Sequence, residues 1–221
     1  MKNIYKIILT ALPLLPLSSC GDFLDKFPET SLSPETFYTS EKELELATNG
    51  FYAMLPKTDD TTDGALQDND LQYHVSLSDI QKGSRQAETA SWGTSTWSDL
   101  RALNWYLEHS VNCTNEEIRN KYDGVAYYFR AMFYYEKVRK YGDIPWYDHV
   151  ISDTDKAELY RARDSRGFVM QKVMEDLDRA IAGLPETWAE GVYRVNRYAA
   201  YAYKCCSRKS RHGGEKKRMN D

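Results

Sequence analysis

The segment from Thr114 to Pro145 constrains the fold more than any other part of the chain. Thr114 and Glu117 have the spacing of a capping box, in which each side chain bonds the other residue's backbone N–H at a helix start. Gly142 suits the left-handed backbone that ends many helices, and Pro145 prevents the helix from resuming. The pattern predicts one long helix that ends near Tyr141. Its buried face would carry Ile118, Tyr122, Val125, Phe129 and Phe133.

Other segments of the chain also carry helical signals. Ser40 and Glu43 form a further capping box, and Pro56 marks the end of the helix that they open. Helical spacing of apolar residues predicts the others over about residues 97–111, 165–182 and from 196 onward. Alternation from Leu71 to Leu77 predicts one short strand. We therefore predict an all-α fold of tetratricopeptide-like helical hairpins with long loops, although no clean 34-residue repeat is present.

The composition argues against several classes of function. The formal net charge of −4 argues against a nucleic-acid partner, because such partners usually require a basic face. The four cysteines form no pair with metal-ligand spacing, and the four histidines lie outside any catalytic motif. We therefore predict no resident metal, no cofactor and no enzymatic activity, and we interpret the possible carboxylate pair Glu186 and Glu190 as surface charges. The 17 tyrosines and 5 tryptophans suit helix packing and also suit flat polar ligands such as sugars.

Residues 1–19 have the pattern of a bacterial secretory signal. Lys2 and Lys6 precede the apolar core Ile7–Leu17, which is shorter than the roughly 20 residues that span a bilayer. The core leads to Cys20 through Leu-Ser-Ser, which resembles a lipobox, where the cysteine thiol carries lipid. We predict lipid attachment at Cys20 and a protein that is anchored to the membrane without crossing it. An ordinary secretory signal with a chance cysteine is the alternative.

The remainder of the chain divides into three predicted regions. Residues 20–40 are interpreted as a tether and docked arm, and residues 41–203 as a helical domain. Residues 204–221 carry seven lysines and arginines against two acidic residues, and we predict that this basic tail is disordered. The amphipathic pattern stops inside a helix that has barely begun, which favours a frameshifted or truncated product. A functional tail that binds nucleic acid or anionic lipid is the alternative.

Three stretches resemble the SusD/RagB family of nutrient-binding lipoproteins. Cys20–Asp25, followed by Pro28 and Phe37-Tyr38, resembles the start of the mature family members. The helix that begins at Trp97 resembles a family helix with the pattern W-x-x-x-Y-x-x-I-x-x-x-N, but it has Arg101 at the tyrosine position and its asparagine, Asn104, falls earlier than in that pattern. Residues 130–145 closely match the block R-A-F-x-Y-F-x-L-V-x-x-Y-G-D-[VI]-P and are the most specific of the three.

The resemblance covers residues 20–203 and implies a fold, a location and a function. Family members are helical, with tetratricopeptide-like hairpins, and they lie on the outer surface of the outer membrane as lipoproteins. They bind glycans or other nutrients and cap a TonB-dependent transporter of the SusC type, and they are not enzymes. Because family members are much longer, the resemblance also implies that this chain is an incomplete SusD-like domain. The missing part would supply much of the ligand surface.

Five residues are candidates for sugar contact. Trp92 and Trp97 flank a Gly-Thr-Ser-Thr loop, and an exposed indole offers an apolar face for the C–H side of a sugar. Arg85, Asn69 and Asn104 could bond the sugar hydroxyls. The competing interpretation places Trp97 in the core of its helix and makes Trp92 a loop anchor.

The segment Asp59–Asp70 also resembles a calcium-binding loop. Asp59, Thr61, Asp63, Gly64 and Asp70 occupy template positions 1, 3, 5, 6 and 12, although Thr61 and Asp70 are poorer than the usual residues. Pro56 also breaks the helix that should enter such a loop. We therefore interpret the segment as a solvated acidic loop.

The sequence thus predicts a lipid-anchored protein of the outer membrane that captures oligosaccharide and passes it to a TonB-dependent, SusC-like transporter. One alternative is a helical adaptor lipoprotein that binds only other proteins. Another is a non-functional gene fragment without a stable fold. Cooperative thermal unfolding would count against that last alternative.

Overall fold

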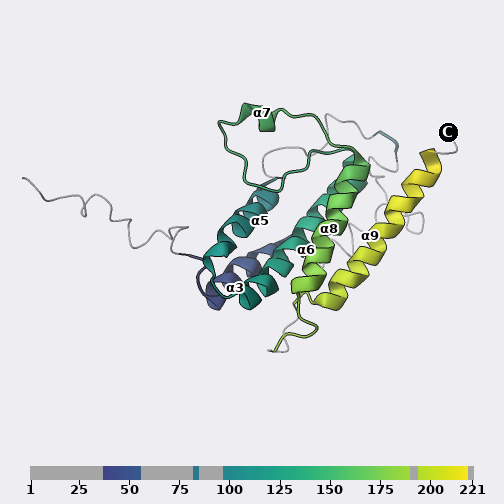
Figure 1. The fold of residues 1–221 in the computed structure, drawn as a ribbon. Coiled ribbons are helices and arrows are strands. Elements are labelled where there is room, and N and C mark those ends of the chain that lie inside the picture. The colour runs from purple at the N-terminus through teal and green to yellow at the C-terminus, as the bar shows by residue number, and fades with distance from the viewer. Residues whose placement is uncertain (1–36, 56–81, 85–96, 190–193, 219–221) are drawn as a thin grey trace, which may run out of the picture. The chain divides into compact units, whose positions relative to one another are not determined.

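The computed structural model describes residues 37–55, 82–84, 97–189 and 194–218, with only the backbone described over 209–218. These residues form helices, and within them no strand is present, so the predicted all-α class is confirmed. Figure 1 shows the principal helices side by side. In chain order the helical elements are α3 (Glu41–Asn49), the 3-10 helix η2 (Gly50–Met54), α5 (Ser98–His109), the 3-10 helix η5 (Ser110–Asn112), α6 (Glu116–Tyr141), α7 (Lys156–Leu159), α8 (Arg166–Gly183) and α9 (Arg197–Arg218).

Helix α6 is the centre of the packing, as the sequence predicts. It contacts α3, α5 and α8, and its buried residues are concentrated between Tyr122 and Tyr134. Its cap differs from the prediction by one residue, because the side chain of Asn115, and not that of Thr114, accepts hydrogen bonds from the N–H groups of Glu117 and Ile118. The helix ends at Gly142, whose φ of 78° is readily adopted only by glycine.

Helices α6 and α8 approach each other closely through glycine. A Cβ atom on Gly183 would overlap the carbonyl oxygen of Asn120, and one on Gly124 would crowd the backbone of Leu184. The absence of side chains at this crossing lets the two backbones meet. The predicted stripe of α8 lies against this core and is buried at Met170, Val173 and Leu177, together with Val169 and Ala180.

Helix α3 begins with the capping box that the sequence predicts. The Ser40 hydroxyl accepts from the Glu43 N–H, while the Glu43 carboxylate accepts from the Ser40 N–H. Leu44 and Phe51 follow in the core. The aromatic residues of α6 complete that core, with Phe129 and Tyr134 fully buried.

Helix α9 extends into the C-terminal region that the sequence predicts to be a tail. The sequence predicted a disordered tail from residue 204, whereas the backbone stays helical to Arg218. Ser207 is buried and donates to the Tyr203 carbonyl, and Lys204 forms an ion pair with Asp178 of α8. The first turn of the predicted tail therefore packs on α8.

Several predictions concern residues outside those that the structure describes. They are the signal segment and Cys20, the strand Leu71–Leu77 and the acidic loop Asp59–Asp70. Within the described ranges, no helix combines the length and the apolar character that a membrane crossing requires.

Candidate functional site

A buried ion pair joins helices α6 and α8. The Arg130 guanidinium donates from Nε and Nη2 to the two carboxylate oxygens of Asp176, and both distances are 2.7 Å. The side chains of Arg130 and Asp176 are only 3% and 2% exposed. Two parallel charge-assisted hydrogen bonds of this kind fix both side chains in orientation.

The charge state of this pair follows from two opposed effects. Burial alone would lower the pKa of Arg130, but the hydrogen bonds and the negative charge of Asp176 outweigh it, so this pKa is raised. Burial raises the pKa of Asp176, and Arg130 opposes that rise. The bidentate geometry favours the ionised pair, because a neutral carboxyl would place a proton against one of the guanidinium N–H groups.

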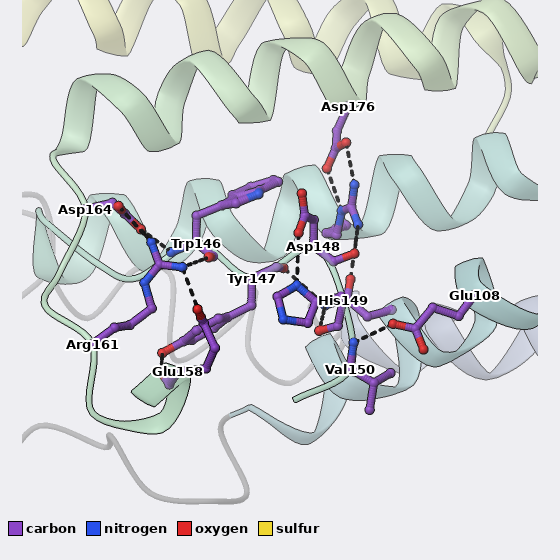
Figure 2. Close-up of polar contacts among 12 residues, drawn as sticks. Glu108, Trp146, Tyr147, Asp148, His149, Val150, Glu158, Arg161, Asp164 and Asp176 are labelled. Carbon is purple, nitrogen blue, oxygen red and sulfur yellow. Dashed lines mark hydrogen bonds and ion pairs between the residues drawn. The ribbon is translucent and has the colours of Figure 1, made fainter. Parts of the chain in front are cut away.

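The pair supports the segment that follows α6. Nη1 of Arg130 donates to Oδ1 of Asn104 at 3.1 Å and to the Asp148 carbonyl at 3.4 Å. The Asn104 amide then donates to the carbonyls of Tyr147 and His149 at 3.1 and 3.0 Å. Figure 2 shows the resulting arrangement, in which the 146–150 segment crosses beside these buried polar groups.

Tyr134 fixes the same segment from the core of α6. Its hydroxyl accepts from the Tyr147 N–H at 2.6 Å and donates to the Tyr147 carbonyl at 3.1 Å. Its ring lies 4.2 Å from that of Trp146, centroid to centroid. The backbone of the segment therefore finds its hydrogen-bond partners in side chains, in the absence of a helix or a sheet.

Arg161 holds the outer part of the connection between α6 and α8. It donates to the Trp146 carbonyl and to the carboxylates of Glu158 and Asp164, and Asp164 accepts in turn from the Trp146 N–H at 2.8 Å (Figure 2). An isolated antiparallel bridge pairs Ile144 with Asp164. The segment is therefore fixed at both of its edges.

This arrangement exposes a polar edge. The side chains of Asp148 and His149 are 59% and 49% exposed, and His149 Nδ1 lies 3.2 Å from an Asp148 oxygen. Glu108 accepts from the Val150 N–H at 2.6 Å, which ties the edge to α5 (Figure 2). Groups of three or more potential metal ligands are absent from the part of the chain that the structure describes.

An aromatic and cationic cluster lies at the start of α5. The half-buried Trp97 ring lies 5.6 Å from that of Phe133 and 6.0 Å from that of Tyr147, both edge to face. The Lys137 ammonium lies 5.8 Å from the Trp97 ring centroid. We call Trp97, Phe133, Lys137 and Tyr141 the Lys137 cluster.

The structure describes two of the five predicted sugar contacts. Trp97 is partly buried, so its ring is neither fully exposed for sugar contact nor fully enclosed in the core. Asn104 is 1% exposed and its side chain bonds to three residues of its own chain, so it has an internal structural role in place of the predicted ligand contact. The physical reason is that Arg130 and the 146–150 backbone, which are remote in sequence, enclose it. Trp92, Arg85 and Asn69 lie outside the described residues.

Sequence reasoning did not identify the buried ion pair. A signal was available, because Asp176 lies on the predicted apolar face of its helix, between Val173 and Leu177. A carboxylate in such a position requires a buried partner. Nothing in the spacing indicates that this partner is Arg130, 46 residues earlier.

Comparison with known proteins now identifies the family. The model of a SusD-like family, described as "starch-binding associating with outer membrane", matches residues 22–206. The chain belongs to this SusD-like family. A curated SusD-like protein P2 from Formosa agariphila is 29% identical over 199 residues, which cover 83% of this chain and 38% of that protein.

Solved SusD-like structures share the fold. A SusD-like protein from Bacteroides fragilis has a TM-score of 0.66 at 23% identity, over 82% of this chain and 37% of that one. A SusD-like carbohydrate binding protein from the same species has a TM-score of 0.61 at 16% identity, over 78% and 37% of the two chains. The chain thus spans less than two-fifths of the length of these SusD-like relatives.

Proposed function

We propose that this SusD-like chain binds glycan at the outer membrane and delivers it to a TonB-dependent, SusC-like transporter. The observation that carries the proposal is the family match over residues 22–206. A solved relative described as a carbohydrate binding protein supports the ligand class. The proposed activity is capture without catalysis, in which aromatic rings stack on the sugar and polar groups bond its hydroxyls.

Membrane attachment is proposed to depend on Cys20. Metabolic labelling of cells with radioactive palmitate, followed by membrane fractionation, tests this proposal. The protein should carry label and sediment with the outer membrane, and Cys20→Ser should abolish both. Labelled protein after Cys20→Ser would overturn the assignment. Cys205 and Cys206, which are exposed free cysteines, provide matched control substitutions.

Glycan capture is proposed to use Trp92 and Trp97, with Arg85 and Asn69 as hydrogen-bonding groups. Affinity electrophoresis in gels that contain a panel of polysaccharides tests this. Retardation of the full chain by at least one glycan, lost in Trp92→Ala, is the expected result. Tyr160→Ala is the matched control, because it removes a ring that is 84% exposed and contributes little packing. Absence of retardation on every glycan would favour the adaptor that binds only proteins.

The transporter contact is tested by co-purification. The full chain should recover a TonB-dependent transporter from detergent-solubilised outer membranes. Cys20→Ser should lose the transporter, and replacement of residues 1–20 by an unrelated lipoprotein signal should restore its recovery. That result would show that the anchor brings the chain to the transporter but does not itself form the contact. Failure to recover any transporter in the wild type would overturn this part of the proposal.

A further inference from the structure

Lys137 has an unusual environment for a lysine near the surface. Its ammonium lies 5.3 Å from the Phe133 ring centroid, 5.7 Å from that of Tyr141 and 5.8 Å from that of Trp97. Phe133 and Tyr141 are one turn before and one turn after it on α6, whereas Trp97 is the N-cap residue of α5. Three aromatic rings from two helices therefore surround one cation.

The ammonium of Lys137 forms no ion pair within the described part of the chain, and Asp99 acts on it only from beyond contact distance. No hydrogen bond and no ion pair joins it to another described residue, so the rings are its contacts. Burial lowers the pKa of Lys137, the nearby Lys140 lowers it further, and Asp99 opposes them. A partly desolvated cation in this state gains from any anion that approaches it.

Seven other partly buried cations in the described ranges are differently arranged. They form ion pairs with carboxylates: Arg119 with Glu116, Lys121 with Glu41, Arg161 with Asp164, Lys172 with Glu175, Arg194 with Glu45, Arg197 with Glu186 and Lys204 with Asp178. Lys121 and Arg194 show that a cation over aromatic rings can also have a carboxylate partner, since both lie over Trp188. The absence of a carboxylate partner at Lys137 is therefore not a general property of the partly buried cations.

We propose that Lys137 and Trp97 form a subsite for an acidic sugar. The carboxylate of a uronic acid, or a sulfate ester, would pair with the Lys137 ammonium. The C–H face of the same sugar ring would pack on the exposed part of the Trp97 indole. This inference rests on the proposed glycan binding and adds the substrate class.

The competing explanation is that Lys137 only covers apolar rings with its aliphatic stem. Lys137→Met separates the two, because methionine keeps an unbranched stem over the rings and removes the charge. Lys137→Arg restores a cation at the same position. Lys140→Met is the matched control, since it removes one exposed positive charge three residues along the same helix.

The experiment is affinity electrophoresis of the full chain, purified in detergent, on polygalacturonate, dextran sulfate and neutral dextran or amylopectin. We expect retardation by polygalacturonate or by dextran sulfate, and the two arms separate carboxylate from sulfate recognition. Lys137→Met should weaken that affinity by roughly tenfold or more, in line with the loss of one charge-assisted hydrogen bond. Lys137→Arg should retain most of it, and Lys140→Met should change it by less than about twofold.

Four outcomes would overturn the subsite. Equal losses in Lys137→Met and Lys140→Met would mean general charge attraction, and unchanged affinity in Lys137→Met would mean that the lysine only covers the rings. Binding to neutral glycans alone would refute the acidic substrate class and leave the proposed glycan binding intact. Binding to none of the glycans would refute both. Thermal unfolding of each variant verifies that the comparison is made between folded proteins.

Discussion

Two cations of helix α6, Arg130 and Lys137, lie seven residues apart and differ in every respect that matters for function. Arg130 is buried and makes two 2.7 Å hydrogen bonds to Asp176, with further bonds to Asn104 and the backbone of Asp148. Lys137 is half-buried and faces aromatic rings, and it forms no ion pair with the described residues. The charge of Arg130 is paired within the fold, whereas the charge of Lys137 is not paired with any described residue.

A third charged residue of α6 extends this comparison. Asp123 precedes Arg130 by seven residues, and its Oδ1 atom is buried without a hydrogen-bond partner among the described residues. Burial raises the pKa of Asp123 to about 6, and the neighbouring Ser110 and Arg119 oppose the rise only in part. Asp123 therefore resembles Lys137 in being partly buried and in forming no ion pair with the described residues.

The comparison shows that burial and pairing together determine what a charged group can do. A buried pair contributes little net free energy compared with apolar residues, but loss of one partner is costly because the other charge remains enclosed. An unpaired charge near the surface avoids most of that cost through solvent and the aromatic rings.

Replacement of Arg130 should have the largest effect. Arg130→Met leaves the Asp176 carboxylate buried and unpaired, so we expect the free energy of unfolding to fall by about 3–5 kcal/mol. Urea denaturation measures this. Arg139→Met is the control, because it removes the exposed pair with Glu136 and should cost less than about 1 kcal/mol. Similar losses in the two variants would contradict the distinction. If Arg130→Met does not fold, the double variant with Asp176→Leu should recover folding.

Replacement of Asp123 should change the pH dependence of stability. Its pKa of about 6 in the fold exceeds that of an unfolded aspartate, so the fold binds the proton more tightly. Stability should therefore decrease as the pH rises from about 4 to 6 and then level off, with a contribution of about 3 kcal/mol. Asp123→Asn should lack this decrease, whereas the exposed Asp153→Asn should retain it. Urea denaturation at pH 4.5 and pH 7 gives the result, and parallel curves for all three proteins would refute it.

Removal of the Tyr134 hydroxyl should have a smaller effect, directed at the 146–150 segment. Tyr134→Phe leaves the buried N–H of Tyr147 without its 2.6 Å acceptor, so we expect a loss of about 1–3 kcal/mol. Hydrogen exchange should show faster exchange of the Tyr147 amide, with little change in α8. Protection of that amide at the wild-type level would mean that Asn104 and Arg130 hold the segment without the hydroxyl.

Replacement of Lys137 should have the smallest effect on stability. Lys137→Met removes a charge that lacks a partner, so the free energy of unfolding should change by only about 0.5 kcal/mol. Thermal unfolding checks this against Arg130→Met. A loss as large as that of Arg130→Met would assign Lys137 to the scaffold and would weaken the acidic-sugar subsite.

The sequence alone was sufficient for the helical class, the family and most helix boundaries. Helix periodicity and caps are local properties, so the start at Ser40 and the end at Gly142 followed from neighbouring residues. The block at residues 130–145 carried the family resemblance, which the match over residues 22–206 confirmed. The packing of residues 204–207 did not follow from the sequence, because this turn depends on α8 for partners.

Only the tertiary structure decided which polar residues are internal and which remain open. Asn104 had the sequence character of a ligand contact, yet it is enclosed by Arg130 and by a segment more than 40 residues away. Lys137 stands at the leucine position of the family block, but nothing local indicates that Trp97 reaches it from another helix. Periodicity along a chain reports which face of a helix is apolar. It carries no information on the distant charge or ring that will lie opposite a given side chain, and that pairing determines whether the group stabilises the fold or is available to a ligand.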